Sequence, residues 1–163
     1  MKITVLGAEE YALKLSRLGS ASEGITKKAV YRAADVVADA VKANLQAMPV
    51  VDNNYNIYAY QQHKKARMSE AQRDGLVESF GISKMQNDGG YINVKLGFDG
   101  YNSIRTQKYP QGQPNVLIAR IYENGGSTAE KQPFIKPALN KTRKAAQQKM
   151  ADVIDEEMAK LMR

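Results

Sequence analysis

Few residues of this chain could carry catalysis or hold a metal. The sequence has one histidine, His63, and no cysteine. Without cysteine there is no disulfide framework, thiolate nucleophile, iron–sulfur cluster or cysteine-ligated zinc. With a single histidine, a catalytic triad or a histidine-rich metal cage has at most one candidate. His63 stands between Gln62 and Lys64 in a polar stretch, which favours a solvated loop histidine over a ligand or a general base.

Other catalytic patterns are also missing from the sequence. The Gly-Gly-Ser-Thr segment at 125–128 is not followed by a lysine at P-loop spacing, so it predicts a turn rather than a nucleotide site. Neighbouring carboxylates such as Glu9 and Glu10 do not face one another on a helix. No Gly-x-Ser-x-Gly or Ser-x-x-Lys nucleophile motif occurs. We therefore expect a protein that is not an enzyme and that uses no cofactor and no metal.

Positive charge is the feature that could select a partner. Lysine and arginine number 24 against 17 aspartates and glutamates, a net charge of +7. Clustered basic residues are typical of nucleic-acid binding, and Tyr55, Tyr58 and Tyr60 precede Lys64 and Lys65, so stacking on bases could combine with phosphate contacts. The excess charge is modest, and no helix-turn-helix or RNA-binding aromatic motif occurs. Nucleic-acid binding therefore stays an alternative.

Length and hydropathy favour one α+β domain over residues 1–163, which is ordinary single-domain size. No apolar run is long enough to cross a membrane. The apolar stretch at the start of the sequence is too short for a signal peptide. We expect no membrane partner and synthesis in a cytoplasm.

Apolar spacing predicts two helices in the first third of the chain. The first is a short helix over 8–18, which Gly19 would end. The second is a long helix over 21–48, which Ser20 and Glu23 would begin as a capping box. The following stretch, 50–72, has no clear period and is interpreted as an insert without regular structure.

A third helix, also long, is predicted over 134–161. Pro137 is compatible only with a first helical turn, which places the beginning of this helix. Its predicted apolar face consists of Leu139, Ala146, Met150, Val153, Ile154, Met158 and Leu161.

An antiparallel sheet of three to four strands is predicted over 76–123, packed against the two long helices. Strands are expected at 76–85 and 91–98, joined by turn residues at 87–90 as a hairpin. A loop follows over 99–115. The nearly continuous apolar run at 116–123 predicts a central strand covered on both faces.

The charges of the predicted last helix are segregated. Basic side chains occupy its first half and acidic ones its second half, the reverse of the order that the helix dipole favours. A partner surface would explain that order, and so would drift. The residues concerned are Lys141, Arg143 and Lys144, followed by Asp152, Asp155 and Glu156.

Four motifs occur in an order known from one protein family. A long helix ends in Ala-Met-Pro at 47–49, Gly-Leu-Val-Glu-Ser follows at 75–79, Glu-Asn-Gly stands at 123–125, and Pro-Phe-Ile-Lys-Pro-Ala-Leu covers 133–139. Over nearly the whole chain this order resembles the tail-component family of long-tailed bacteriophages. The matching positions are Gly75, Leu76, Ser79, Glu123, Gly125, Pro133, Phe134, Pro137, Ala138 and Leu139.

The resemblance implies a structural virion protein of the phage neck, assembled in the cytoplasm of a bacterial host. Such proteins complete the tail and join it to the head as a ring, commonly a hexamer. The implied partners are further copies of the chain, the tail-tube protein and the head-completion or connector proteins, while DNA passes through the ring without sequence-specific binding.

Candidate interfaces for such a ring are the tyrosines Tyr55, Tyr58 and Tyr60 and the charged stretches of the last helix. Basic residues 141–149 of one subunit could meet acidic residues 152–157 of the next. Segments 50–72 and 101–115 are expected to become ordered on binding. The types of residue at the motif positions favour purely structural roles over partner contacts: Gly75 releasing the chain into a strand, Phe134 as a buried anchor, and Gly125 at a positive φ.

Overall fold

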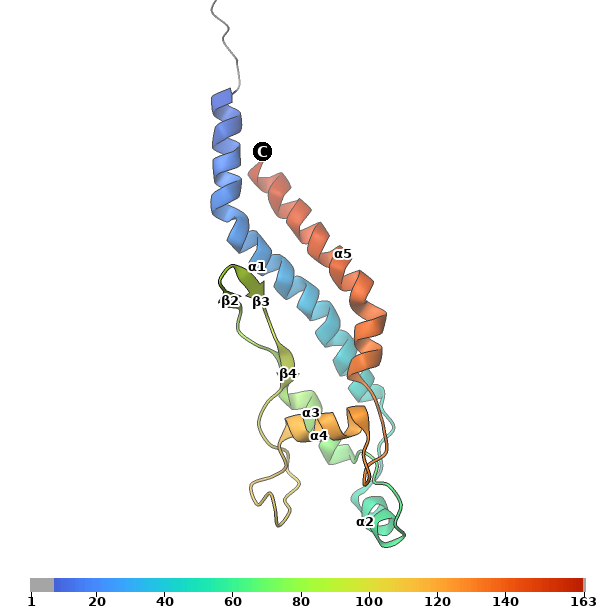
Figure 1. Cartoon of the computed structure of the whole chain (residues 1–163). Coiled ribbons are helices and arrows are strands. Elements are labelled where there is room, and N and C mark those ends of the chain that lie inside the picture. Colours follow the sequence, from blue (N-terminus) through green and yellow to red (C-terminus); the bar gives the residue numbers. More distant parts are fainter. Residues whose placement is uncertain (1–7, 163) are drawn as a thin grey trace, which may run out of the picture.

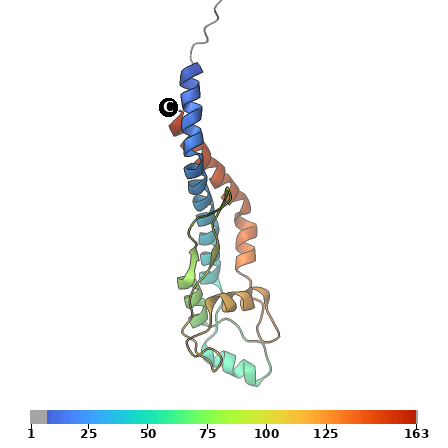
Figure 2. The ribbon, with the colours of Figure 1, turned by 60° about the vertical axis from the view of Figure 1, so that its left-hand side comes forward.

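Two long antiparallel helices form the spine of an elongated molecule. The computed structural model describes residues 8–162. Within this range, α1 (Ala8–Ala47) and α5 (Ile135–Leu161) pack along one another in opposite directions (Figures 1 and 2). The 40 residues of α1 correspond to about 60 Å at 1.5 Å per residue. The predicted α+β class, with two long helices and a small antiparallel strand portion, is confirmed.

α1 is a single continuous helix, so the predicted break at Gly19 is wrong. A glycine in an exposed helix interior costs only about 1 kcal/mol relative to alanine, and the turns on both sides continue the helix. The predicted capping box is wrong for the same reason, because Ser20 lies inside the helix and its hydroxyl donates to the Arg17 carbonyl at 2.9 Å. Glu23 forms an ion pair with Lys27 instead.

The stretch at 50–72 has regular structure, contrary to the expectation of an insert without any. α2 (Asn53–Gln61) begins after Asp52, whose carboxylate accepts the Tyr55 N–H at 2.8 Å. α3 (Glu70–Ser79) begins with a capping box made by Ser69 and Gln72. The helical period of α2 is hidden in the sequence because, among its described side chains, only Ala59 is buried. That 50–72 and 101–115 become ordered on binding stays a prediction.

The strands form two small antiparallel sheets instead of one. β1 (Phe80–Ile82) pairs with β4 (Leu96–Phe98), and β2 (Gln86–Asp88) pairs with β3 (Tyr91–Asn93). The predicted hairpin turn is confirmed, because Gly89 and Gly90 connect β2 to β3 with positive φ. The predicted strand at 91–98 is divided between the two sheets, and residues 76–79 belong to the end of α3.

The apolar run at 116–123 forms α4 (Asn115–Asn124), so the predicted central strand is wrong. A short apolar run does not by itself distinguish a buried strand from a buried helix. The burial pattern is helical, because Ile118, Ala119 and Tyr122 are buried while Val116 and Ile121 are exposed. The preceding Pro114 is compatible with a helix start.

The core lies where the C-terminal half of α1 meets α3, α4 and the start of α5. Phe134 is completely buried there and contacts Phe98 edge-on, with ring centroids 6.0 Å apart. α5 begins at Ile135, with Pro137 in its first turn, as predicted. The predicted apolar face is wrong at Leu139, which is 45% exposed. The fully buried positions of α5 are Ala138, Thr142 and Val153.

Candidate interaction surfaces

Glu123 joins two of the sequence motifs into one structural unit. Its carboxylate accepts the backbone N–H groups of Phe134, Ile135 and Lys136, each at 2.8 Å. The first N–H groups of a helix have no partner within the helix, and a negative charge is favourable beside them. α5 has no acidic residue in its own first turn. Glu123 of α4 therefore supplies the charge that the sequence of α5 omits.

Gly125 makes the reversal of the chain after α4 possible. Its φ is +73°, and a Cβ at this position would lie 2.9 Å from the Lys131 Cβ. The predicted positive φ is therefore confirmed, and the close approach of Lys131 is a second reason for glycine. Pro133 and Pro137 are exposed, and each directly precedes a buried residue, Phe134 and Ala138 respectively.

Gln132 is a central residue that the sequence analysis missed. Its side-chain Oε1 accepts the Met68 N–H at 2.8 Å, and its Nε2 donates to the Pro49 carbonyl at 3.1 Å. The backbone N–H of Gln132 donates to the Tyr122 carbonyl at 2.8 Å. These bonds tie both ends of the 50–72 stretch to the junction of α4 and α5. No signal in a single sequence marks a neutral side chain for such a role.

Tyr122 completes this hydrogen-bonded junction. Its hydroxyl lies 3.0 Å from both the Arg67 carbonyl and Gln72 Oε1. Burial raises the pKa of this tyrosine, because the charged form would lose hydration. Tyr122, Glu123 and Gln132 thus hold α4, α5 and the 50–72 stretch together.

Gly75 packs α3 closely against the loop after β4, which corrects its predicted role of releasing the chain into a strand. A Cβ at Gly75 would lie 3.1 Å from the Asn102 Cβ. Leu76 is completely buried, and the Ser79 hydroxyl donates to its carbonyl at 3.4 Å. The second motif therefore forms the last turns of a helix and one wall of a groove.

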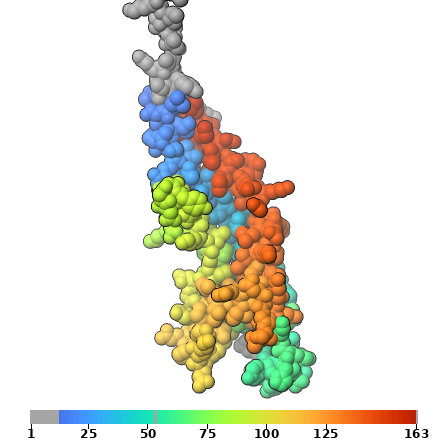
Figure 3. All heavy atoms as spheres, viewed as in Figure 1, coloured from blue at the N-terminus to red at the C-terminus, as the bar shows by residue number. Residues whose placement is uncertain are grey.

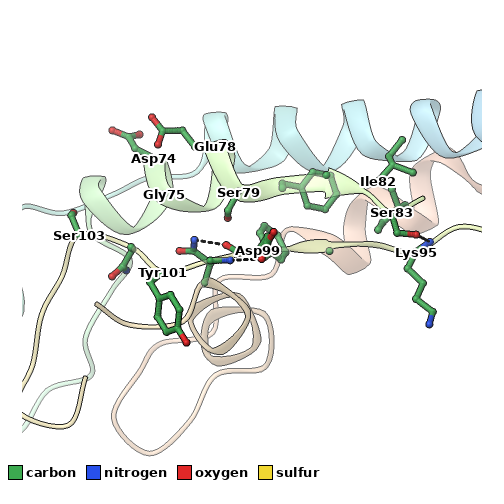
Figure 4. Close-up of a pocket in the computed structure, with 18 of the residues that line it drawn as sticks. Asp74, Gly75, Glu78, Ser79, Ile82, Ser83, Lys95, Asp99, Tyr101 and Ser103 are labelled. Atoms are coloured by element: carbon green, nitrogen blue, oxygen red, sulfur yellow. Dashed lines mark hydrogen bonds between the residues drawn. The ribbon is translucent and has the colours of Figure 1, made fainter. Parts of the chain in front are cut away.

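This groove, of about 1030 Å³, lies over the outer face of β1 and β4 (Figure 4). Gly81 and Gly97 face each other across the two strands, and a Cβ at either would meet nothing within 4 Å. Ser79 of α3 lines one side, with Glu78 at the rim and its carboxylate directed away from Asp99, and Asp99 and the loop after it line the other side. The groove therefore has a bare backbone floor.

Two buried asparagines support the loop beside the groove. Asn102 Oδ1 accepts the backbone N–H groups of Ile104 and Gln113, and Asn115 Nδ2 donates to the Asp99 carbonyl at 2.8 Å. In the part of the chain that the structure describes, Asn102 Nδ2 and Asn115 Oδ1 have no hydrogen-bond partner. The partnered atoms of the two side chains hold the loop in place, whereas the two unpartnered atoms are enclosed and do not present a ligand site.

α2 brings the three predicted interface tyrosines to one end of the molecule (Figure 3). Tyr55 and Tyr58 are exposed, and Tyr60 is 83% exposed. Ile57, which the sequence analysis did not select, is exposed beside them. The helix is anchored by Asn56, whose side chain makes hydrogen bonds with both the N–H and the carbonyl of Arg67.

The charged side chains predicted on α5 are exposed along its length. Lys141, Arg143 and Lys144 have no ion pair within the described residues. In the acidic half, Asp152 accepts a hydrogen bond from Gln148, whereas Asp155 and Glu156 make no such bond within this range.

Glu157, next to these acids, connects the two long helices. Its carboxylate lies 2.7 Å from both Lys160 and Lys28, and these hydrogen bonds lower the pKa of Glu157 to about 2. The reversed charge order of α5 therefore has a partly intramolecular explanation. The basic half of α5 has no corresponding ion pairs within residues 8–162.

No group of three or more metal-ligating side chains occurs among the described residues. No helix in this part of the chain is long and apolar enough to cross a bilayer. Comparison of the chain with protein-family models, curated proteins and solved structures finds no match in any of the three.

Proposed function

We propose that this chain is a structural protein of the neck of a long-tailed bacteriophage, which acts as a ring to complete the tail end and join tail to head. Its partners are further copies of itself, the tail-tube protein and the head-completion or connector proteins. It is assembled in the bacterial cytoplasm, is retained in the virion and performs no catalysis. DNA passes through the ring without sequence-specific contacts.

The observation that carries the proposal is the large surface of the isolated subunit. The chain exposes 11420 Å² at a mass of 18.1 kDa, whereas a compact monomer of that mass exposes roughly 8,100 Å². The difference exceeds the roughly 1,600 Å² that one subunit contributes to two standard interfaces. A subunit with two neighbours in a ring needs such a surface.

Two further features support an assembly role. The exposed tyrosines of α2 belong to the residue types enriched in protein interfaces, and the hydrogen bonds of Asn56 hold that helix in place before a partner arrives. Three of the four motifs carrying the family resemblance are connected by hydrogen bonds, because Glu123 accepts the Phe134 N–H and Gln132 donates to the Pro49 carbonyl.

Electron microscopy of a lysate from the parent phage lacking this gene tests the proposal. We expect filled heads beside separate tails of normal length, which a plasmid-borne copy restores to joined particles. Overlong or ragged tubes would identify a terminator that stops tube growth. Normal infectious virions would contradict a neck function of either kind.

A nucleic-acid-binding accessory protein is the second candidate, supported by the neighbourhood of α2. Lys64 Nζ lies 5.6 Å from the centre of the Tyr58 ring, and Tyr60 is exposed beside them. Binding through phosphates must weaken by about tenfold or more between 50 and 200 mM salt. Fluorescence anisotropy with labelled single-stranded and duplex DNA would detect this, and absent or salt-insensitive binding would eliminate the candidate.

A further inference from the structure

The outer face of the β1–β4 sheet is left uncovered by the chain itself. Its inner face contributes Phe80 and Phe98 to the core, in contact with each other at 4.9 Å between ring centroids. On the outer face, the paired Gly81 and Gly97 leave a floor without side chains (Figure 4). A two-stranded sheet is only marginally stable without packing. The open face thus offers backbone and aliphatic surface to an incoming segment.

The lining of this groove carries more acidic than basic groups. Glu78, at the end of α3, is exposed and has no hydrogen bond or ion pair within the described residues. Asp74 is paired with Arg73 at 2.8 Å, and Asp99 lies on the opposite side, where its carboxylate accepts the Gly100 N–H. Among the described residues that line the groove, Lys95 is the one cation. A segment with lysine side chains would complement Glu78 and Asp99, with its aliphatic stems over the glycine floor.

The chain itself carries such a segment on its other flank. Lys141, Arg143 and Lys144 are exposed in the first half of α5 and have no ion pair within the described range. In Figure 1 the β1–β4 strands and α5 lie on opposite sides of α1. Since α1 lies between these two elements in that view, one subunit leaves the two surfaces apart, whereas identical subunits placed side by side can bring them together.

We propose that the basic first half of α5 of one subunit docks in the β1–β4 groove of the next, with Lys144 and Lys141 near Glu78. This inference rests on the proposed ring function and names its subunit interface. The contact is heterologous, since two different patches meet, and repeated contacts of this kind close into a ring when the rotation allows.

The charges of α5 also allow one competing contact between subunits, which differs from the proposed one in its symmetry. The basic half of α5 could pair with the acidic half of α5 in a second copy. Two identical helices with basic first halves and acidic second halves satisfy both pairings at once when antiparallel, which produces a two-fold dimer that does not propagate. A ring therefore favours the groove, whereas a dimer that depends on Asp155 and Glu156 would favour helix pairing.

Charge exchange between Glu78 and Lys144 tests the proposed interface. Glu78→Lys places a cation at the last turn of α3, where the helix dipole favours it, so the fold should be retained. Native mass spectrometry of the purified chain and phage titre from complemented lysates are the two measurements. We expect Glu78→Lys and Lys144→Glu each to lower the ring population and the titre by at least tenfold, because like charges meet at the interface. The combined variant should restore both.

Glu156→Lys is the matched control, because it makes the same charge change on an exposed helical position outside the groove. It should leave the ring and the titre unchanged. Circular dichroism of every variant verifies folding.

Five outcomes would contradict the interface or the neck function. A ring that tolerates both single variants, or singles whose defects the combined variant does not rescue, overturns the interface and leaves the neck function standing. A dimer lost on Glu156→Lys also overturns it, in favour of α5 pairing. If the free chain is monomeric, the titres decide, and normal titres for both single variants reject the interface. Normal virions without the gene reject the neck function itself.

Discussion

Polar side chains have partners within the chain at the α4–α5 junction, whereas several of those on the two flanks of the molecule have none among the described residues. At the junction, Glu123, Gln132 and Tyr122 direct their side chains inward to partners in other segments. On the flanks, Glu78 and Lys144 have no partner within the described chain. A buried polar group without a partner is costly, whereas an exposed one is solvated by water and remains available to a neighbour. The motif residues therefore mainly build the fold, and the surfaces suited to assembly lie beside them.

Among the substitutions that test this difference, Phe134→Ala is expected to lower the free energy of unfolding the most. The ring is completely buried, and truncation of a buried phenylalanine costs about 3–5 kcal/mol. Urea denaturation monitored by circular dichroism measures the loss. Leu139→Ala, five residues away at a position 45% exposed, is the control and should cost much less. Equal losses at the two positions would contradict the placement of the core.

Glu123→Ala should come next, at about 2 kcal/mol. It removes a carboxylate from three N–H groups at the start of α5, and charge-assisted hydrogen bonds of this kind contribute about 1.5–3 kcal/mol. The control is Glu130→Ala, whose exposed carboxylate pairs with Arg67 at 2.9 Å and should matter by less than about 1 kcal/mol. The same denaturation measurement compares them. A smaller loss for Glu123 than for Glu130 would rule out the junction as a stabilising unit.

A pH-dependent effect on stability is expected from Glu157, whose carboxylate forms the ion pair with Lys28 that joins the two long helices. Its pKa in the folded chain is about 2, below the ordinary value of 4.5. A lowered folded-state pKa stabilises the fold above the unfolded pKa, and this contribution is lost as pH falls from about 4.5 toward 2. The melting temperature should therefore fall less steeply over this range in Glu157→Gln than in the natural chain. Identical pH profiles would show that the Lys28 contact does not stabilise the helix pair.

The smallest effect on stability is expected from Tyr60→Ser. The side chain is 83% exposed, and such surface substitutions usually change stability by less than about 0.5 kcal/mol. Under the proposed function, the same change should nevertheless reduce phage titre in complemented lysates. Tyr91→Ser, also at an exposed tyrosine, serves as the control on β3. Full titre with Tyr60→Ser would remove α2 from the set of assembly surfaces.

The parts of the fold that the sequence predicted were those set by apolar periodicity or by residues with a restricted or unusual backbone conformation. Pro137 placed the start of α5 within one residue, and the glycines at 89 and 90 marked the hairpin turn. Prediction failed where local patterns were ambiguous. The apolar run at 116–123 suited a strand as well as a helix, and Gly19 looked like a stop signal although α1 continues through it.

The sequence alone determined the charge balance, the scarcity of catalytic side chains, the two long helices and the positive φ at Gly125, because each follows from composition or from neighbouring residues. Only the tertiary structure decided that Glu123 caps α5, that Gln132 holds the 50–72 stretch, and that the glycine-floored groove and the basic half of α5 lie on opposite flanks. These relations join residues far apart in the chain. They depend on how helices and strands pack, which no local pattern encodes.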